Sequence, residues 1–187
     1  WKINFGIGLE NSVYKNSTFN QKQINNNVVT IDFNSKINFN KYAAFGQVSK
    51  SFFNNNLSLS AGFRTDFNDY SNEMNNPLDQ FSPRIAASYS INNKLNLGLS
   101  IGKYYQLPPY TILGYRDNSN TLINKENNIT YIQNNQISTG IEYSPTKFSK
   151  ISLEGFYKKY NKYPFLLEKN ISLANLGADF GVIGNEP

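Results

Sequence analysis

The 187-residue sequence contains no cysteine and no histidine, and only one methionine and one tryptophan. Without cysteine, the chain has no disulfide, no thiol chemistry and no cysteine zinc site. Without histidine, it lacks the base of Ser-His-Asp and Cys-His catalysis and the commonest transition-metal ligand. An enzyme built on this chain would have to use carboxylates or serine alone. We therefore expect no enzymatic activity, no cofactor and no metal site.

Charged residues and long apolar runs are also scarce. Charged residues make up 17% of the chain and the net charge is +5, whereas typical globular proteins carry roughly a quarter of charged residues. Lysines and arginines are scattered along the sequence, while a nucleic-acid-binding protein gathers them on one face. No nucleic-acid partner is expected. No stretch approaches the roughly 18 apolar residues of a transmembrane helix, and no signal peptide opens the sequence.

Asparagine is the most frequent residue, and phenylalanine and tyrosine account for nearly all of the 15% aromatic content. This composition suits strands joined by polar turns. The strongest pattern is alternation of apolar and polar residues with period two, which predicts strands with one apolar and one polar face. The segments with this pattern are 1–9, 57–67, 81–91, 95–102, 137–143 and 151–157, and 28–53 is interpreted as one long strand bent near Asn40.

The connections between these strands alternate between short and long. Short turns are expected at 54–56, 92–94 and 144–150, and long polar loops at 11–27, 68–80, 106–128 and after Tyr160. Transmembrane barrels have short periplasmic turns, longer extracellular loops and strands of about 9–11 residues, which is the length of several of these segments. The pattern therefore favours a transmembrane barrel, although a soluble β-sandwich or β-solenoid shows the same alternation within its strands.

Several short motifs follow one another along the chain. They are Tyr42–Val48 (YAAFGQV), Leu57–Asp66 (LSLSAGFRTD), Ser82–Tyr89 (SPRIAASY), Gly102–Asp117 (GKYYQLPPYTILGYRD), Gly140–Tyr143 (GIEY), Leu153–Tyr160 (LEGFYKKY), Asn175–Gly177 (NLG) and Gly184–Glu186 (GNE). In their order and spacing, these motifs resemble those of TonB-dependent receptors, especially the Bacteroidota branch. The likeness is patchy before residue 40 and nearly continuous after it.

This resemblance implies an all-β fold of antiparallel transmembrane strands, about seven of the 22 that form such a barrel. Residues 1–187 would then be part of a single β-barrel domain, with the plug domain and the remaining strands outside the sequence. It also implies a place in the cell outer membrane. The expected partners are outer-membrane lipid, the protein's own plug and remaining strands, and the TonB complex through the missing N-terminal part, with a surface lipoprotein as a further candidate.

The function that the resemblance implies is active import of a nutrient captured at the extracellular face. Iron chelates, cobalamin, oligosaccharides and peptides are all carried by such receptors. Three other functions stay open from the residues alone: a passive outer-membrane porin or channel, an outer-membrane hydrolase, and a cell-surface β-rich adhesion or binding module.

Two sets of side chains are candidate sites. Aromatic faces and a charge pair in and beside loop 106–128 suit ligand stacking and orientation, although the same tyrosines could simply pack the loop. This set is Tyr104, Tyr105, Tyr110, Tyr115, Arg116 and Asp117. The second set is polar and is expected to face the lumen, either as an anion path or as an ordinary charge ladder facing the plug. It comprises Arg64, Asp66, Arg84, Glu142 and Glu154. Paired carboxylates could also perform acid–base chemistry.

Overall fold

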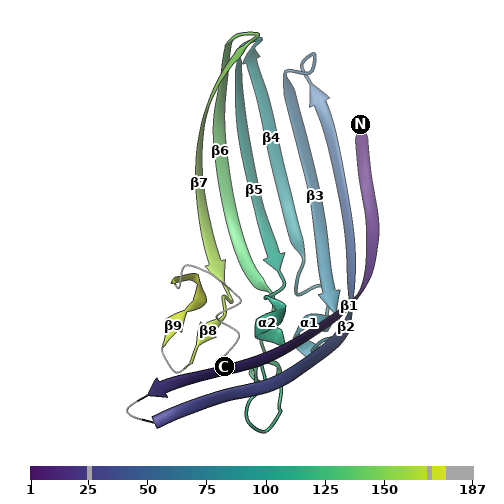
Figure 1. The fold of residues 1–187 in the computed structure, drawn as a ribbon. Helices are drawn as coiled ribbons and strands as arrows, with labels where there is room; N and C mark the ends of the chain where they lie inside the picture. Colours follow the sequence, from purple (N-terminus) through teal and green to yellow (C-terminus); the bar gives the residue numbers. More distant parts are fainter. Residues whose placement is uncertain (25–26, 168–169, 176–187) are drawn as a thin grey trace.

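The computed structural model describes residues 1–24, 27–167 and 170–175 as a seven-stranded antiparallel sheet that curves into a half-barrel (Figure 1). The all-β antiparallel fold predicted from the sequence is confirmed. The strands pair in chain order: β1 (Lys2–Ile24), β2 (Asn27–Phe52), β3 (Leu57–Asn68), β4 (Ser82–Asn92), β5 (Leu95–Gln106), β6 (Ile132–Thr146) and β7 (Ser149–Asn161). The motif Gly184–Glu186 and residues 176–177 of the Asn175–Gly177 motif lie outside the described residues.

Connections at the two ends of the sheet differ in length, as the sequence predicted. At one end, residues 53–56, 93–94 and 147–148 form short turns. Asn54 and Asn55 take positive φ angles there, which asparagine tolerates better than most residues. At the other end, residues 69–81 and 107–131 form long connections that contain α1 (Asn72–Asn75), α2 (Tyr110–Leu113) and α3 (Ile123–Glu126). After β7, this end also holds β8 (Phe165–Leu166), β9 (Ile171–Ser172) and η1 (Leu173–Asn175).

The expectation of a polar loop at 11–27 is wrong. Residues 11–24 continue β1 and pair with residues 27–40 of β2 without interruption. The two strands therefore extend beyond the ends of the other strands as one hairpin, and bend across the end of the sheet where α1 and α2 lie (Figure 1). The single long strand predicted at 28–53 is present, and its outer half needed a partner for its backbone N–H and C=O groups. The polar segment before it supplies that partner.

The register aligns the apolar residues of all seven strands on one surface. Ile85, Ile101, Ile137 and Tyr157 are consecutive cross-strand partners on β4 to β7. We call this surface the apolar face. It consists of the alternate residues 3–9, 42–52, 57–67, 83–89, 95–103, 135–143 and 151–159. The intervening residues form the polar face, which is rich in serine, glycine and amides.

The β1–β2 hairpin changes the face that it buries along its length. Up to Leu9, the apolar residues Ile3, Phe5, Ile7 and Leu9 lie exposed on the apolar face. Beyond Asn11, the buried positions belong to the other face, which carries Ser12, Phe33, Ser35, Ile37 and Phe39. The buried side of the hairpin therefore changes near residues 10–11, where the hairpin passes the end of the sheet.

Candidate functional site

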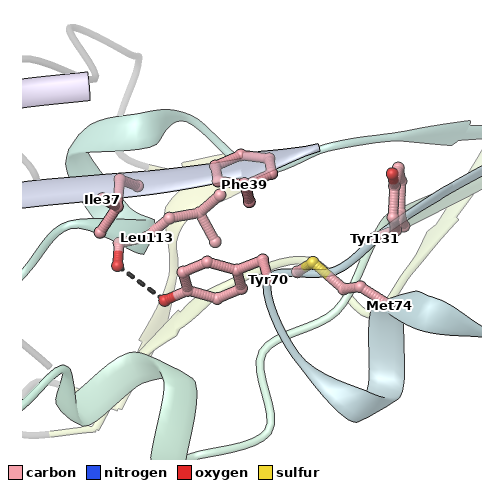
Figure 2. Close-up of a cluster of buried hydrophobic side chains, with 6 residues drawn as sticks. All are labelled: Ile37, Phe39, Tyr70, Met74, Leu113 and Tyr131. Carbon is pink, nitrogen blue, oxygen red and sulfur yellow. Dashed lines mark hydrogen bonds between the residues drawn. The ribbon is translucent and has the colours of Figure 1, made fainter. Parts of the chain in front are cut away.

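The larger of the two buried hydrophobic clusters in the described residues lies between the extended β1–β2 hairpin and the long connections, rather than within the sheet. Figure 2 shows Ile37 and Phe39 of β2 over Leu113 of α2 and Tyr70, with Met74 of α1 on the far side of the Tyr70 ring. We call this group, together with Tyr131, the loop core. Met74 and Leu113 are fully buried. The loop core therefore holds the two long connections against one face of the hairpin, beyond the end of the sheet.

Hydrogen bonds tie the loop core to the backbone. The Tyr70 hydroxyl donates to the Leu113 carbonyl oxygen at 2.7 Å (Figure 2). Asn68 Nδ2 donates to the Tyr131 hydroxyl at 2.9 Å, and Asn68 Oδ1 accepts from the Tyr70 backbone N–H. Because these polar groups are buried, losing one partner would leave the other unsatisfied at a cost of about 1–3 kcal/mol. The connections thus have a single specified arrangement.

A second set of contacts joins Asp69, at the start of one connection, to β2. The Asp69 carboxylate accepts from the Asn40 backbone N–H at 2.7 Å and from Asn40 Nδ2 at 2.8 Å. The hydrogen bond from the Asn40 side chain, followed by that from its backbone, lowers the pKa of Asp69. Asn40 also accepts from Asn11 at 2.9 Å. Asn40 of β2 is therefore bonded both to β1, through Asn11, and to the connection after β3, through Asp69.

A closed ring of four side chains links the hairpin to loop 107–131. Lys41 Nζ contacts the Glu10 carboxylate at 2.6 Å and donates to the Tyr110 hydroxyl at 2.9 Å. The Tyr110 hydroxyl donates to Ser12 Oγ at 3.1 Å, and Ser12 Oγ donates to Glu10 at 2.9 Å. The Tyr110 ring also packs on Tyr14 and Phe39. One tyrosine of the loop is thereby anchored on both strands of the hairpin.

The other predicted loop residues are engaged within the loop and its supports. Tyr115 is buried and meets Phe33 edge-on, with ring centroids 5.6 Å apart. Arg116 donates to the Asn120 carbonyl at 2.6 Å, while the Asp117 carboxylate accepts from the backbone N–H groups of Ser119 and Thr121. The Thr121 backbone bond, followed by the Ser119 side-chain bond, lowers the pKa of Asp117. Arg116 and Asp117 therefore shape the loop through separate partners.

Arg84 occupies an open position on the polar face. Its cross-strand partners are Gly62 on β3 and Gly102 on β5, so neither neighbour covers it. Its guanidinium lies 4.5 Å from the centroid of the Tyr104 ring, a distance suited to cation–π attraction. The Tyr104 ring in turn lies so close to Gly102 that a Cβ there would meet it at 2.9 Å. Tyr104 and Arg84, predicted in separate sets, thus form one stack.

The remaining charged residues of the second set also lie on the polar face. Arg64 binds Asp66, two residues along the same strand, with two hydrogen bonds of 2.7 and 2.6 Å. Glu142 is held by Lys150 at 2.5 Å near the short-turn end. Glu154 lies opposite Gly140 on the neighbouring strand, whereas Glu142 lies opposite Ser152. The two carboxylates are therefore offset along the sheet and have different partners.

Two hollows lie against the polar face of the sheet, on the strand side of the loop core. The larger, of about 420 Å³, is lined by Gln47, Ser60, Arg64, Arg84, Ser100 and Tyr104, among others. The second, of about 370 Å³, is lined by Glu10, Lys41, Arg64, Asp66, Tyr105 and Tyr131, among others. Within the part of the chain that the structure describes, no three acidic side chains come together to hold a metal ion. These surfaces can bind polar groups through hydrogen bonds, charge and aromatic stacking.

Sequence reasoning missed the residues of the hairpin that support the loops, chiefly Tyr14, Phe33, Ile37 and Phe39. A signal was present. The alternation at residues 31–39 places Ile31, Phe33, Ile37 and Phe39 on one face of a strand too long to be needed for crossing a bilayer. An apolar stripe exposed to water requires something to cover it, and the long connections are the available cover.

Alkaline titration should detect the loop core through Tyr70. Burial raises the pKa of Tyr70 to about 12, against a weaker opposite effect of Arg116. The neutral hydroxyl is therefore favoured in the folded state. Its contribution to stability is complete below pH 10, where an unfolded tyrosine ionises, and is lost as the pH rises towards 12. Subtracting the ultraviolet titration of Tyr70→Phe from that of the parent should leave a component with a midpoint near pH 12. A midpoint near pH 10 would contradict the buried position.

The comparisons with known proteins agree with this architecture. A search of curated proteins finds no match. The family model described as TonB dependent receptor-like, beta-barrel, matches residues 1–182, almost the whole chain. The matched region includes every described strand and both long connections. The chain therefore belongs to the TonB-dependent receptor-like β-barrel family.

Proposed function

We propose that this chain forms part of an outer-membrane receptor that captures a nutrient at the extracellular face and imports it with energy supplied through TonB. Membership of the family carries this proposal: its members are outer-membrane transport receptors, not enzymes, and they generally contain a plug domain and interact with TonB. The exposed apolar face suits contact with lipid, and the polar face suits a lumen.

The proposed barrel is completed by further strands. In the described sheet, β1 and β7 are edge strands, each with one row of backbone groups unpaired by a neighbouring strand. In a bilayer these groups must be satisfied by hydrogen bonds, and closure of the sheet does so. We assign residues 1–187 to one such β-barrel domain, with the plug lying against the polar face.

Ligand capture is assigned to the end of the sheet that carries the long connections, which is the extracellular end in transmembrane barrels. Tyr104 and Tyr105 border the two hollows and are the proposed contacts, with Arg64, Asp66 and Arg84 beside them. Tyr110, Tyr115, Arg116 and Asp117 contribute by holding the loop in place. Glu142, near the short turns, and Glu154, further along the sheet, also line the proposed lumen. A surface lipoprotein covering the long connections is a further proposed partner.

A transport assay tests the energy coupling. Cells that express the whole receptor would be offered a labelled panel of ferric siderophores, cobalamin, oligosaccharides and peptides, with and without TonB. We expect one class to bind in both strains and to accumulate only where TonB is present. Accumulation that persists without TonB would indicate a passive channel. Surface binding without accumulation in either strain would indicate an adhesion or binding module.

A further inference from the structure

Charged residues are rare on the apolar face, and those present are all lysines. Lys50, Lys103 and Lys159 lie on it, as the strand alternation and register require, and no aspartate or glutamate does within the alternate residues that define the face. Lys50 lies at the short-turn end, 4.7 Å from the Trp1 ring and 4.9 Å from the Phe52 ring. Lys103 and Lys159 lie at the opposite end, where β5 and β7 approach the long connections.

Lys103 and Lys159 flank Asn135 in one row across three strands. Lys103 on β5 pairs with Asn135 on β6, and Asn135 pairs with Lys159 on β7. Neighbouring strands lie about 4.8 Å apart, so the two lysine backbones are separated by roughly 10 Å. Flexible lysine side chains span that gap readily. Three hydrogen-bond-donating side chains therefore stand side by side at the rim of the apolar face.

The neighbouring residues orient this row. Lys103 Nζ lies 5.1 Å from the centroid of the Tyr105 ring. The Tyr105 hydroxyl donates to Gln133 Oε1, and Gln133 Nε2 donates to Asn135 Oδ1 at 3.3 Å. This bond uses the Asn135 oxygen and leaves its NH₂ group to donate elsewhere. None of the ion pairs among the described residues involves Lys103 or Lys159.

Next to the row of Lys103, Asn135 and Lys159, towards the short-turn end, the apolar face contains a hollow. The hollow of about 450 Å³ is lined by Pro83, Ile85, Ile101, Ile137 and Tyr157, with Lys103, Asn135 and Lys159 at its rim; Arg84, Gly102 and Gln136 complete its lining. Ile85, Ile101 and Ile137 are all substantially exposed. An apolar hollow capped by cationic and amide donors is complementary to an anionic lipid, whose hydrocarbon lies towards the membrane centre and whose anionic group lies at the membrane surface.

We propose that Lys103, Asn135 and Lys159 bind the phosphate of a phosphorylated lipid in the outer leaflet, and that an acyl chain of this lipid fills the hollow below. Charge complementarity selects the phosphate, since within the described residues neither lysine has an ion-pair partner and the apolar face carries no carboxylate. The long connections place the row at the extracellular rim, so the lipid belongs to the outer leaflet. The inference rests on the proposed outer-membrane location, but not on the cargo or on TonB.

Native mass spectrometry of the whole receptor, delipidated in detergent, tests this site. The probes are diphosphorylated lipid A, the same lipid after enzymatic removal of its phosphates, and inorganic phosphate. The variants are Lys103→Gln with Lys159→Gln, and Lys50→Gln as the matched control at the other rim. We expect the double variant to bind lipid A at least about tenfold more weakly, and the control to bind it like the parent. The parent should bind the dephosphorylated lipid as weakly as the double variant does.

Three results would overturn the proposal. Equal lipid A binding by the double variant and the parent would remove the lysines from the site. Equal binding of the dephosphorylated lipid by the parent would leave only the apolar hollow. Displacement of lipid A by equimolar inorganic phosphate would indicate a free-anion site. Unchanged thermal unfolding of the exposed Lys→Gln variants serves as the folding control. Because the readout is lipid binding in detergent, failure of the transport assay alone leaves this test intact.

Discussion

Leu113→Ala is expected to release the long connections while the half-barrel remains folded. Leu113 is fully buried in the loop core, and its carbonyl oxygen accepts the hydrogen bond from Tyr70. Truncating a buried leucine typically costs about 2–5 kcal/mol, because both transfer energy and packing are lost. The loss falls on local opening, since the loop core is separate from the strand pairing that forms the sheet. Ligand capture should weaken with it.

Hydrogen exchange measured by mass spectrometry checks this expectation. Backbone amides of 107–131 and of residues 11–24 should exchange at least about thirtyfold faster in Leu113→Ala, the factor that corresponds to about 2 kcal/mol. Leu78→Ala is the matched control, because Leu78 lies in the neighbouring connection and is 76% exposed. Equal exchange in the two variants would show that the loop core does not hold the connections. Unfolding of the strands as well would show that the loops and the sheet form one cooperative unit.

Leu99→Arg is expected to destabilise the folded barrel by about 2–4 kcal/mol, the cost of a basic side chain on the lipid face at the bilayer midplane. Leu99 is exposed on the apolar face, in the middle of β5, with Ala87 and Thr139 as its cross-strand partners. An arginine there must either lose its hydration or distort the lipid around it. The substitution leaves the backbone pairing of β5 unchanged.

Leu95→Arg provides the control for depth. Leu95 begins the same strand on the same face, beside the short turn at 93–94, where the cost should fall to about 0–1 kcal/mol. Equilibrium unfolding of the whole receptor in lipid vesicles compares the two variants. If both lost the same stability, the apolar face would not be meeting a bilayer. The soluble β-sandwich alternative would then regain support.

Period-two alternation is a local property of the chain, and it was sufficient to predict most of the strands and the face on which each side chain lies. Arg64, Asp66, Arg84, Glu142 and Glu154 share the polar face for this reason, because residues two apart in a strand point the same way. Turn composition placed the short connections for a similar reason, since asparagine adopts positive φ angles at little cost. The family likewise follows from the order and spacing of short motifs along the sequence.

Contacts between distant residues could not be predicted in this way. Residues 11–24 are polar and alternate only weakly, and they became a strand because pairing with 27–40 satisfies the backbone of both segments. The ring of Glu10, Ser12, Lys41 and Tyr110 joins positions almost 100 residues apart. Tyr104 and Arg84 stack because register brings Gly102 opposite Arg84.

The sequence by itself thus determined the β-rich class, the two faces of most strands and the family. Only the tertiary structure decided that an extended hairpin covers the long connections, that four of the six predicted loop residues hold those connections in place, and that Lys103, Asn135 and Lys159 form a row. The physical reason is that side-chain direction repeats every two residues along a strand, whereas register and loop packing depend on partners far away in the sequence.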